Sequence, residues 1–400
     1  MICGDIDHFI LNEAKDLYVK QRLSQSEEPT QVIGGLMATS RGATLLKPDQ
    51  LEIREYPIPE LPPDGGLVKV EMAGVCGSDV KYLHGKIKLP TPLILGHEIL
   101  GRVEKLGKTA AAIHKLKEGD RIILKGAIGC GRCADCRRGG ARFCKQRTSY
   151  GGRTTCDKPP HLFGGFADYI YLAPDVLATK VSDELPAEAA VLVGAVMANG
   201  FQWAVRRGGV KMGDYVLIQG PGQQGLSNTF AARHAGAAKI FISGIGRDKP
   251  RLELAKKFGA HRAINVEEES VVDVVRKETN GDMCDVVVDV SGNPQAILNS
   301  IDCVRRQGTM VLAGLTGDST VTPMLMDKLV WGEIKLQGCF TADNDATEAS
   351  LRLLEETKFP VQEMVSHVFP LRDTEKCIRA VGGEIPEMFP TKALINPASG

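Results

Sequence analysis

Four cysteines lie within one short stretch of the chain, at Cys130, Cys133, Cys136 and Cys144. Two residues separate each of the first three, and the fourth follows after seven more. A loop with this spacing can present four sulfur atoms tetrahedrally, and four thiolates fill the coordination shell of zinc without leaving a position for water. The pattern favours a closed, structural zinc site. An iron–sulfur cluster, an accidental cluster and free thiols are the alternatives.

A second set of metal-binding residue types precedes this loop and consists of Cys76, His97 and Glu98. A thiolate, an imidazole and a carboxylate can hold zinc and leave one position open for water or a substrate oxygen, as a Lewis acid requires. Asp79 is suited to accept the second ring N–H of His97, and the hydroxyl of Ser78 can carry a proton away. Taken singly, such a cysteine is more often a core residue and such a histidine a structural one.

A glycine-rich turn, formed by Gly220, Gly222 and Gly225, follows a predicted strand over 216–218 and precedes a predicted helix over 226–235. In this context the glycines permit a tight turn and let a pyrophosphate approach a helix N-terminus. The pattern predicts a dinucleotide site, and a glycine-rich turn without a ligand is the alternative.

The choice of coenzyme depends on the loop after the next predicted strand. Gly244 stands where an NAD enzyme would place an acidic residue. Arg247 and Arg251 can neutralise the 2′-phosphate of NADP, whereas Asp248 can reach a ribose hydroxyl from a longer loop. Arginines at the start of a helix are also commonly only solvated. The sequence therefore leaves both NAD and NADP open.

Two hydrophobic patterns predict the strands and helices that must position the metal-binding and coenzyme-binding residues. From 43 to 170, short alternating strands such as 67–72 and 120–124 predict a β-rich domain. From 200 onward, buried strands alternate with helices, which indicates a parallel sheet covered on both faces. The strands predicted there span 215–218, 239–242, 286–290 and 309–312, and a helix over 347–357 and a strand over 392–395 are expected near the end of the chain.

Composition narrows the class of protein. A chain of 400 residues exceeds what one hydrophobic core usually organises, so two domains are expected. Lys plus Arg and Asp plus Glu both number 49, which does not suggest a nucleic-acid partner. The sequence has no secretory signal and no uninterrupted apolar run of membrane length, so we expect a cytoplasmic protein without a membrane partner. Residues 1–36 form an appended segment with a predicted amphipathic helix over 6–18 and no readable role.

Together these motifs resemble those of the zinc-containing medium-chain dehydrogenases, the family of alcohol, sorbitol and threonine dehydrogenases. The resemblance covers residues 38–400 and includes Lys392 near the end of the chain. It implies an α/β fold, with a β-rich GroES-like catalytic domain and a doubly wound, parallel-sheet Rossmann domain. The expected boundaries are an extension over 1–37, a first catalytic part over 38–198, the Rossmann domain over 199–336 and a second catalytic part over 337–400.

The resemblance also implies residue roles. Cys76 and His97 would bind the catalytic zinc, and Glu98 would be its third ligand or a carboxylate beside the ligands. Ser78 would begin a proton relay, and Lys392 would face the coenzyme pyrophosphate. The nicotinamide would lie against Gly292, Ala313 and Leu315. Each chain would hold two zinc ions and bind NAD or NADP, and homodimers or homotetramers are expected.

Two positions depart from the family pattern. Ala195 stands where members commonly carry a zinc-binding Cys or a water-holding Glu, which favours Cys, His, Glu and water as the ligand set. Lys81 replaces a common relay histidine, for which His84 is a substitute or else a plain surface residue.

The activity that follows is the interconversion of a primary or secondary alcohol and its aldehyde or ketone by hydride transfer with a nicotinamide coenzyme. The partner is therefore a small-molecule alcohol or carbonyl compound. Phe163, Met197 and Trp203 are either walls of its pocket or core residues. A non-enzymatic relative and a zinc-free quinone or enoyl reductase are the rival classes, and retention of the first zinc set argues against both.

Overall fold

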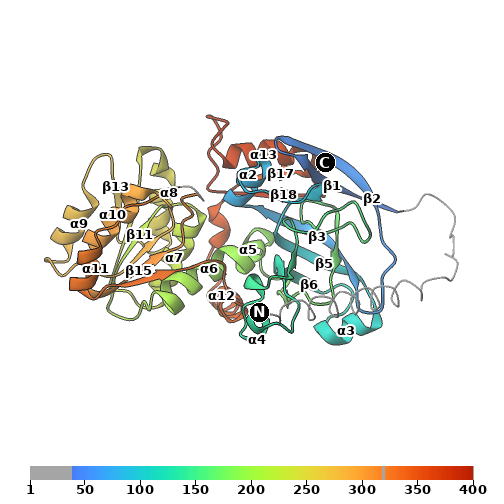
Figure 1. Ribbon diagram of the computed structural model, residues 1–400, viewed down its shortest axis with the longest axis horizontal. Coiled ribbons are helices and arrows are strands. Elements are labelled where there is room, and N and C mark those ends of the chain that lie inside the picture. Colours follow the sequence, from blue (N-terminus) through green and yellow to red (C-terminus); the bar gives the residue numbers. More distant parts are fainter. Residues whose placement is uncertain (1–37, 318–319, 400) are drawn as a thin grey trace, which may run out of the picture. The chain divides into compact units, whose positions relative to one another are not determined.

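The computed structural model describes residues 38–317 and 320–399 (Figure 1). The amphipathic helix predicted over 6–18 lies outside the described residues.

One sheet contains six strands, and every neighbouring pair is parallel. Its strands are β11 (Tyr215–Gln219), β12 (Lys239–Gly244), β13 (Arg262–Asn265), β14 (Cys284–Asp289), β15 (Val304–Leu312) and β16 (Lys335–Gly338). Their spatial order, β13-β12-β11-β14-β15-β16, is that of a dinucleotide-binding Rossmann sheet. The prediction of a parallel sheet is confirmed, and the sheet adds β13 and β16 to the four strands that the hydrophobic runs indicated.

Helices cover both faces of this sheet. Successive side chains of a strand point to opposite sides, and because β11 has consecutive apolar residues, both of its faces must be buried. Val216 and Ile218 pack with α7 (Gln223–His234) and α8 (Lys249–Lys257). Leu217 packs on the other side with α9 (Val271–Glu278) and α10 (Pro294–Cys303). Figure 1 shows α9 and α10 on one side of β11 and α7 on the other. The continuous apolar runs in the sequence reflect this double coverage.

A mixed sheet of seven strands carries the first zinc set. Its main path runs β10-β6-β5-β3-β18-β17, and β9 pairs with β3. The strands are β3 (Gly66–Val75), β5 (Glu98–Leu106), β6 (Arg121–Leu124), β9 (Tyr169–Leu172), β10 (Ala178–Lys180), β17 (Val365–Pro370) and β18 (Lys392–Asn396). A three-stranded sheet of β1 (Thr39–Lys47), β2 (Gln50–Pro57) and β4 (Leu93–Ile94) lies in the same part of the chain. Because β18 pairs with β3, the end of the chain lies beside the segment that carries Cys76.

A helix from Ala187 to Arg207 connects the two sheets in the sequence. It contains the α-helical segments α5 (Ala187–Leu192) and α6 (Ala198–Gly200) and π-helical turns over 193–197 and 201–207. The helix α12 (Asn344–Thr357) packs against it. The boundary expected between 198 and 199 falls inside this helix, and the one expected between 336 and 337 falls inside β16.

This connecting helix is long and apolar enough to span a membrane by length and composition, although the sequence has no uninterrupted apolar run of that length. Within the described structure, 72% of the apolar window is buried, as in the core helix of a globular domain. Its side chains Val191, Leu192 and Val196 belong to the same hydrophobic core as β11.

Candidate metal and coenzyme sites

Cys76 and Ser78 are held at the start of α2 (Gly77–Leu83), directly after β3. The carboxylate of Asp79 accepts a hydrogen bond from the backbone N–H of Cys76 at 2.8 Å, and the backbone N–H of Asp79 donates to the carbonyl of Cys76 at 3.0 Å. Asp79 has no exposed surface. These bonds close the first turn of α2 and fix the direction of the Cys76 side chain.

His97 and Glu98 lie at the start of β5, after a glycine that the turn requires. Gly96 has φ +94, and a Cβ atom there would lie 2.6 Å from the backbone nitrogen of Phe166. The turn directs His97 towards α2, where its Nε2 lies 3.3 Å from the Ser78 hydroxyl and its Nδ1 lies 3.4 Å from Asp79 Oδ1. The strand–turn geometry therefore gathers residues from β3, α2 and β5 at one point.

Donor atoms of Cys76, His97 and Glu98 all lie within 4.8 Å of one another. Nδ1 of His97 and Oδ1 of Asp79 are buried and have no hydrogen-bond partner other than this longer contact with each other. A metal on the opposite ring nitrogen would fix the proton on Nδ1 and shorten the contact with Asp79. The mixed donor set and its ring-orienting carboxylate fit a zinc site with an open position.

The electrostatics of His97 reflect two opposing effects. Burial is the largest single effect and disfavours the imidazolium, but Asp79 and Cys76 together outweigh it, and the pKa of His97 lies well above its ordinary value. The partly buried His97 therefore lies in a negative environment that a bound cation would neutralise.

Lys392 does not lie where the family resemblance implied. Its side chain is fully buried, and its ammonium donates to Glu98 Oε2 at 2.5 Å and to the carbonyl of Val75 at 2.9 Å. A side chain enclosed in this way cannot face a coenzyme pyrophosphate, so the expectation for Lys392 is wrong. The antiparallel pairing of β18 with β3, and of β3 with β5, brings the two charges together across one strand.

A glycine leaves the room for this ion pair. A Cβ atom on Gly74 would lie 2.2 Å from Glu98 Oε2 and 2.9 Å from the Lys392 ammonium. Gly74 is paired with Glu98 in the β3–β5 ladder, so the missing side chain opens the space at the point where the pair forms. Oε2 of Glu98 is bound to Lys392, and a carboxylate oxygen of Glu98 lies within 4.8 Å of the donor atoms of Cys76 and His97.

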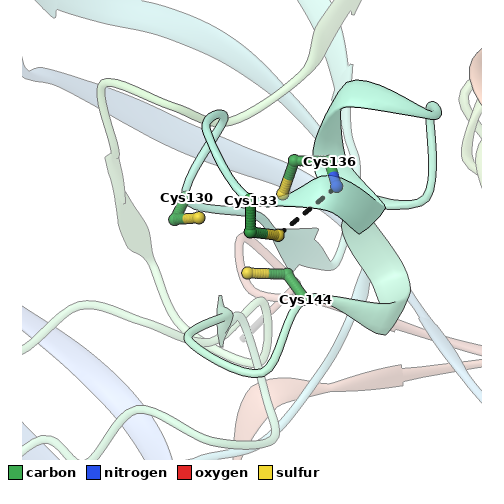
Figure 2. A group of neighbouring side chains, drawn as sticks. All are labelled: Cys130, Cys133, Cys136 and Cys144. Atoms are coloured by element: carbon green, nitrogen blue, oxygen red, sulfur yellow. Dashed lines mark hydrogen bonds between the residues drawn. The ribbon is translucent and has the colours of Figure 1, made fainter. Parts of the chain in front are cut away.

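The four cysteines of the loop converge as their spacing predicts (Figure 2), and their sulfur atoms all lie within 4.8 Å of one another. Cys133 caps the short helix α4 (Ala134–Arg137), and its sulfur accepts a hydrogen bond from the backbone N–H of Cys136 at 3.4 Å. Four sulfur donors at these separations match the shell of a closed zinc site.

The thiols of this loop cannot all ionise without a counter-charge. Backbone N–H groups of Arg132 and Cys133 lower the pKa of Cys130 to about 6. Burial and the neighbouring Cys133 raise the pKa of Cys136 to about 12. Both values belong to a group of interacting thiols, and a bound cation would remove the conflict by holding all four as thiolates.

The glycine-rich turn lies at the carboxyl ends of β11 and β14, where the strand order reverses. Gly220 has φ +104, and a Cβ atom there would lie 3.1 Å from Ser291. A Cβ atom on Gly225 would lie 1.9 Å from the carbonyl oxygen of Gly220, whereas Gly222 has open space in front of it. This turn opens α7 and fits the approach of a pyrophosphate.

The loops after β14 and β15 close the same edge of the sheet. Gly292 donates its backbone N–H to Asp289 at 2.9 Å, and Ala313 donates to the carbonyl of Asp289 at 2.9 Å. A Cβ atom on Gly292 would lie 2.7 Å from the carbonyl oxygen of Leu315. The structure therefore brings together the three residues expected to wall the nicotinamide.

In the loop after β12, the residues considered for coenzyme choice differ in whether their side chains are already bound within the protein. Asp248 binds the backbone N–H of Ile245 at 3.2 Å and Arg251 at 3.0 Å, and only 8% of it is exposed. Arg251 is further held by the carbonyl of Pro390. Arg247 is exposed and has no ion pair among the residues that the structure describes, and its guanidinium lies 5.0 Å from the centre of the Phe389 ring.

The position of Ala195 is partly exposed, although most of the surrounding helix is buried. The carbonyl of the preceding Gly194 accepts a hydrogen bond from the ammonium of Lys125 at 2.9 Å. Sequence reasoning missed Lys125, because a lysine in a loop normally indicates a solvated side chain. Its position directly after the buried strand β6 was the only signal.

His84, considered as a substitute relay, is bound elsewhere. Its Nδ1 lies 2.6 Å from Asp49 and its Nε2 lies 2.6 Å from Glu384. With both ring nitrogens occupied, it clamps the end of α2 and is not a free relay group. Met197 and Trp203 are buried in the large core, and Phe163 is partly buried and packs against Tyr150 and Tyr171.

Comparisons with known proteins agree with this arrangement. Residues 62–183 match the alcohol dehydrogenase GroES-like domain, and residues 225–356 match the zinc-binding dehydrogenase family. A Mycobacterium tuberculosis protein named "Probable alcohol dehydrogenase adh" is 33% identical over 365 residues, which span 90% of this chain and 99% of that protein.

Solved structures give the same result. An alcohol dehydrogenase of Thermotoga maritima superimposes with a TM-score of 0.82 at 27% identity, over 90% of this chain and all of that chain. A zinc-binding dehydrogenase of Sinorhizobium meliloti bound to NADP gives a TM-score of 0.80 at 25% identity over the same shares.

The chain therefore belongs to the zinc-containing medium-chain dehydrogenases. It is an oxidoreductase that interconverts alcohols and carbonyl compounds with a nicotinamide coenzyme.

Proposed function

We propose that Cys76, His97 and Glu98 hold a catalytic zinc and that Cys130, Cys133, Cys136 and Cys144 hold a structural one. The observation that carries the proposal is the convergence of the first three side chains within 4.8 Å, beside a serine hydroxyl and a buried carboxylate. The all-sulfur group supports a closed second site. Membership in a zinc family, rather than the sulfur geometry, favours zinc over an iron–sulfur cluster.

Zinc in the first site would supply Lewis acidity that lowers the pKa of an alcohol hydroxyl. Ser78 lies beside His97 and would accept the hydroxyl proton and pass it on to solvent. Asp79 keeps the ring of His97 in one orientation, and Lys392 offsets the charge of Glu98. Gly220, Gly222 and Gly225 would hold the coenzyme pyrophosphate, and the loops with Gly292 and Ala313 would set the nicotinamide face that receives hydride.

We further propose NADP(H) as the preferred coenzyme. Gly244 offers no carboxylate, and a Cβ atom there would lie 2.7 Å from Pro221, so the turn also excludes an acidic side chain at that position. Asp248 is bound to Arg251 and Ile245, whereas the guanidinium of Arg247 forms no ion pair with any residue that the structure describes. Glu267 is the group that would favour NAD instead, because its exposed carboxylate lies beside the loop after β12 and accepts the backbone N–H of Gly246 at 2.8 Å.

The decisive experiment measures zinc per chain by mass spectrometry and coenzyme reduction with polyols, short alcohols, aromatic alcohols and hydroxy acids, each with NAD and NADP. We expect two zinc ions and faster reduction of NADP. Arg247→Ala should raise the KM for NADP roughly tenfold and leave that for NAD nearly unchanged. One zinc ion together with no alcohol oxidation would refute the function. A preference for NAD that Glu267→Gln abolishes would refute only the coenzyme choice.

We also propose a homodimer or homotetramer in the cytoplasm. The edge strand β16 and the helix α11 (Met326–Gly332) present exposed apolar side chains, among them Val330, Leu336 and Trp331, which is 77% exposed. A second copy that pairs along β16 would cover them. Light scattering should give at least twice the chain mass, and Trp331→Glu should reduce it. The two thiolate-bearing sites suit a reducing compartment.

A further inference from the structure

Lys125 is a charged residue in an unusual place. It follows β6 directly, is partly buried, and its ammonium donates one hydrogen bond, to the carbonyl of Gly194. An ammonium carries three donors, so two remain without a described protein partner. Burial lowers the pKa of Lys125 to about 8; the charge of Asp343 opposes this only in part, and the charge of Arg142 adds to it. The group is therefore still a cation at neutral pH.

Two contacts connect Lys125 with the zinc-binding half of the site. The next residue, Gly126, lies against His97: a Cβ atom on Gly126 would be 3.1 Å from the carbonyl oxygen of His97 and 3.3 Å from its Cβ atom. On the other side, the Gly194 carbonyl that accepts the ammonium hydrogen bond directly precedes Ala195, the partly exposed position at which the family often has a metal-site side chain. Lys125 thus lies between two segments that border the catalytic metal.

A second cation, Arg142 of the cysteine loop, lies close enough to Lys125 for its charge to lower the Lys125 pKa. Arg142 is partly buried, its guanidinium lies 4.7 Å from the centre of the Phe143 ring, and its Nε is buried without a partner. Lys125 and Arg142 are close enough for each to feel the charge of Asp343. Within residues 38–317 and 320–399, neither forms an ion pair with a carboxylate.

Asp343 is not available to neutralise them. Its Oδ1 binds Arg206 at 2.7 Å and also accepts the backbone N–H of Ala346 at 3.0 Å, which caps α12. Enclosing a charge without a counter-charge is unfavourable, so such groups are usually found where a ligand completes the pairing. Among the described residues, Lys125 and Arg142 thus lack an ion-pair partner, and Lys125 adjoins the segments that carry His97 and Ala195, which points to an anion supplied from outside.

We propose that Lys125, with Arg142 as a second cation, binds an anionic group of the substrate, so that the preferred alcohols carry a carboxylate or a phosphate. This inference rests on the proposed function, because it concerns the substrate of the same site. Lys125 is a specificity-determining residue in this scheme. It takes no part in the proton or hydride transfer, and it holds the far end of the molecule while the carbinol lies at the metal.

A purely structural role is the competing explanation for Lys125, which would then only stabilise the π-helical turn that begins at 193. The two roles differ in their effect on charged and neutral substrates. A structural lysine would alter turnover of all alcohols alike when replaced. An anion-binding lysine would affect only the charged members of matched pairs.

The test compares butanediol with hydroxybutyrate and sorbitol with sorbitol phosphate, using the zinc-loaded full-length enzyme. We expect a kcat/KM at least tenfold higher for the anionic member of one pair, and which pair responds identifies carboxylate or phosphate. Lys125→Met should raise the KM for that anion roughly tenfold to a hundredfold and leave the neutral alcohol within about twofold. Lys125→Arg should retain part of the preference, and Arg142→Met should give a smaller loss of the same kind.

The matched control is Lys69→Met, an exposed lysine on β3 of the same sheet, which should change none of these values. Equal kcat/KM within both pairs, or a Lys125→Met enzyme that loses activity equally on neutral and anionic alcohols, would overturn the inference while the dehydrogenase function stands. Absence of any alcohol oxidation with either coenzyme would instead count against the proposed function.

Discussion

The two candidate metal-binding groups of this protein are built in opposite ways. The cysteine loop takes four identical ligands from one stretch of chain and orders them with its own backbone N–H groups. The group of Cys76, His97 and Glu98 takes three different ligands from separate elements, and each is held by a further residue. A closed shell of one ligand type suits a scaffold, whereas a mixed and incomplete shell suits chemistry. Substitutions should therefore damage different properties at the two groups.

Exchange of Cys76 for Ser should have the largest effect. We expect turnover to fall about a thousandfold or more, equivalent to ~4 kcal/mol of barrier, because the open site loses its thiolate ligand. Bound zinc should drop from two ions to one, and the melting temperature should change little. Steady-state kinetics and metal analysis check this together, and retained activity in the variant would remove Cys76 from the catalytic site.

Exchange of Cys130 for Ser should produce the complementary pattern. Loss of the structural ion should lower the free energy of unfolding by on the order of 5 kcal/mol, because that ion is bound only by the folded loop. Thermal unfolding followed by circular dichroism measures the loss. The fraction that remains folded should retain its kcat. A variant that is as stable as the parent protein would show that the loop needs no metal.

Exchange of Lys392 for Met tests the ion pair that supports the catalytic group. The buried carboxylate of Glu98 would lose its counter-charge, and we expect the free energy of unfolding to fall by about 3 kcal/mol. Adding Glu98→Gln should recover part of the loss, because the stranded charge is gone. Urea denaturation of both single variants and the double variant gives the coupling. Additive effects would mean that the pair contributes no coupling energy.

The smallest effect concerns the pH dependence at Lys125. Its pKa in the folded protein is about 8, below the ordinary value of 10.5, so the unfolded chain binds more protons between these two values. The stability of the parent relative to Lys125→Met should therefore rise as the pH increases from about 8 to about 10 and stay level below that range. Melting temperatures of both proteins across this range provide the measurement. Parallel curves would show that the ammonium is not enclosed.

Local patterns in the sequence predicted much of this molecule. The spacing of the thiols, the glycine-rich turn between strand and helix, and the continuous apolar strands all depend on neighbours a few residues away, and the structure agrees with each of them. Such patterns can be read from the sequence because a single turn or strand contains all the residues that form them.

Long-range pairing decided the rest. Lys392 binds Glu98 across 294 positions of sequence, and Lys125 meets the carbonyl of Gly194 across 69. In the sequence, Lys392 and Lys125 are both simply lysines. Strand order and burial give each one its acceptor and exclude water from it. The sequence by itself determined which residues can hold zinc and a dinucleotide. Only the tertiary structure decided which charges are paired and which remain unpaired beside the site, because burial and partner choice arise from packing between distant segments.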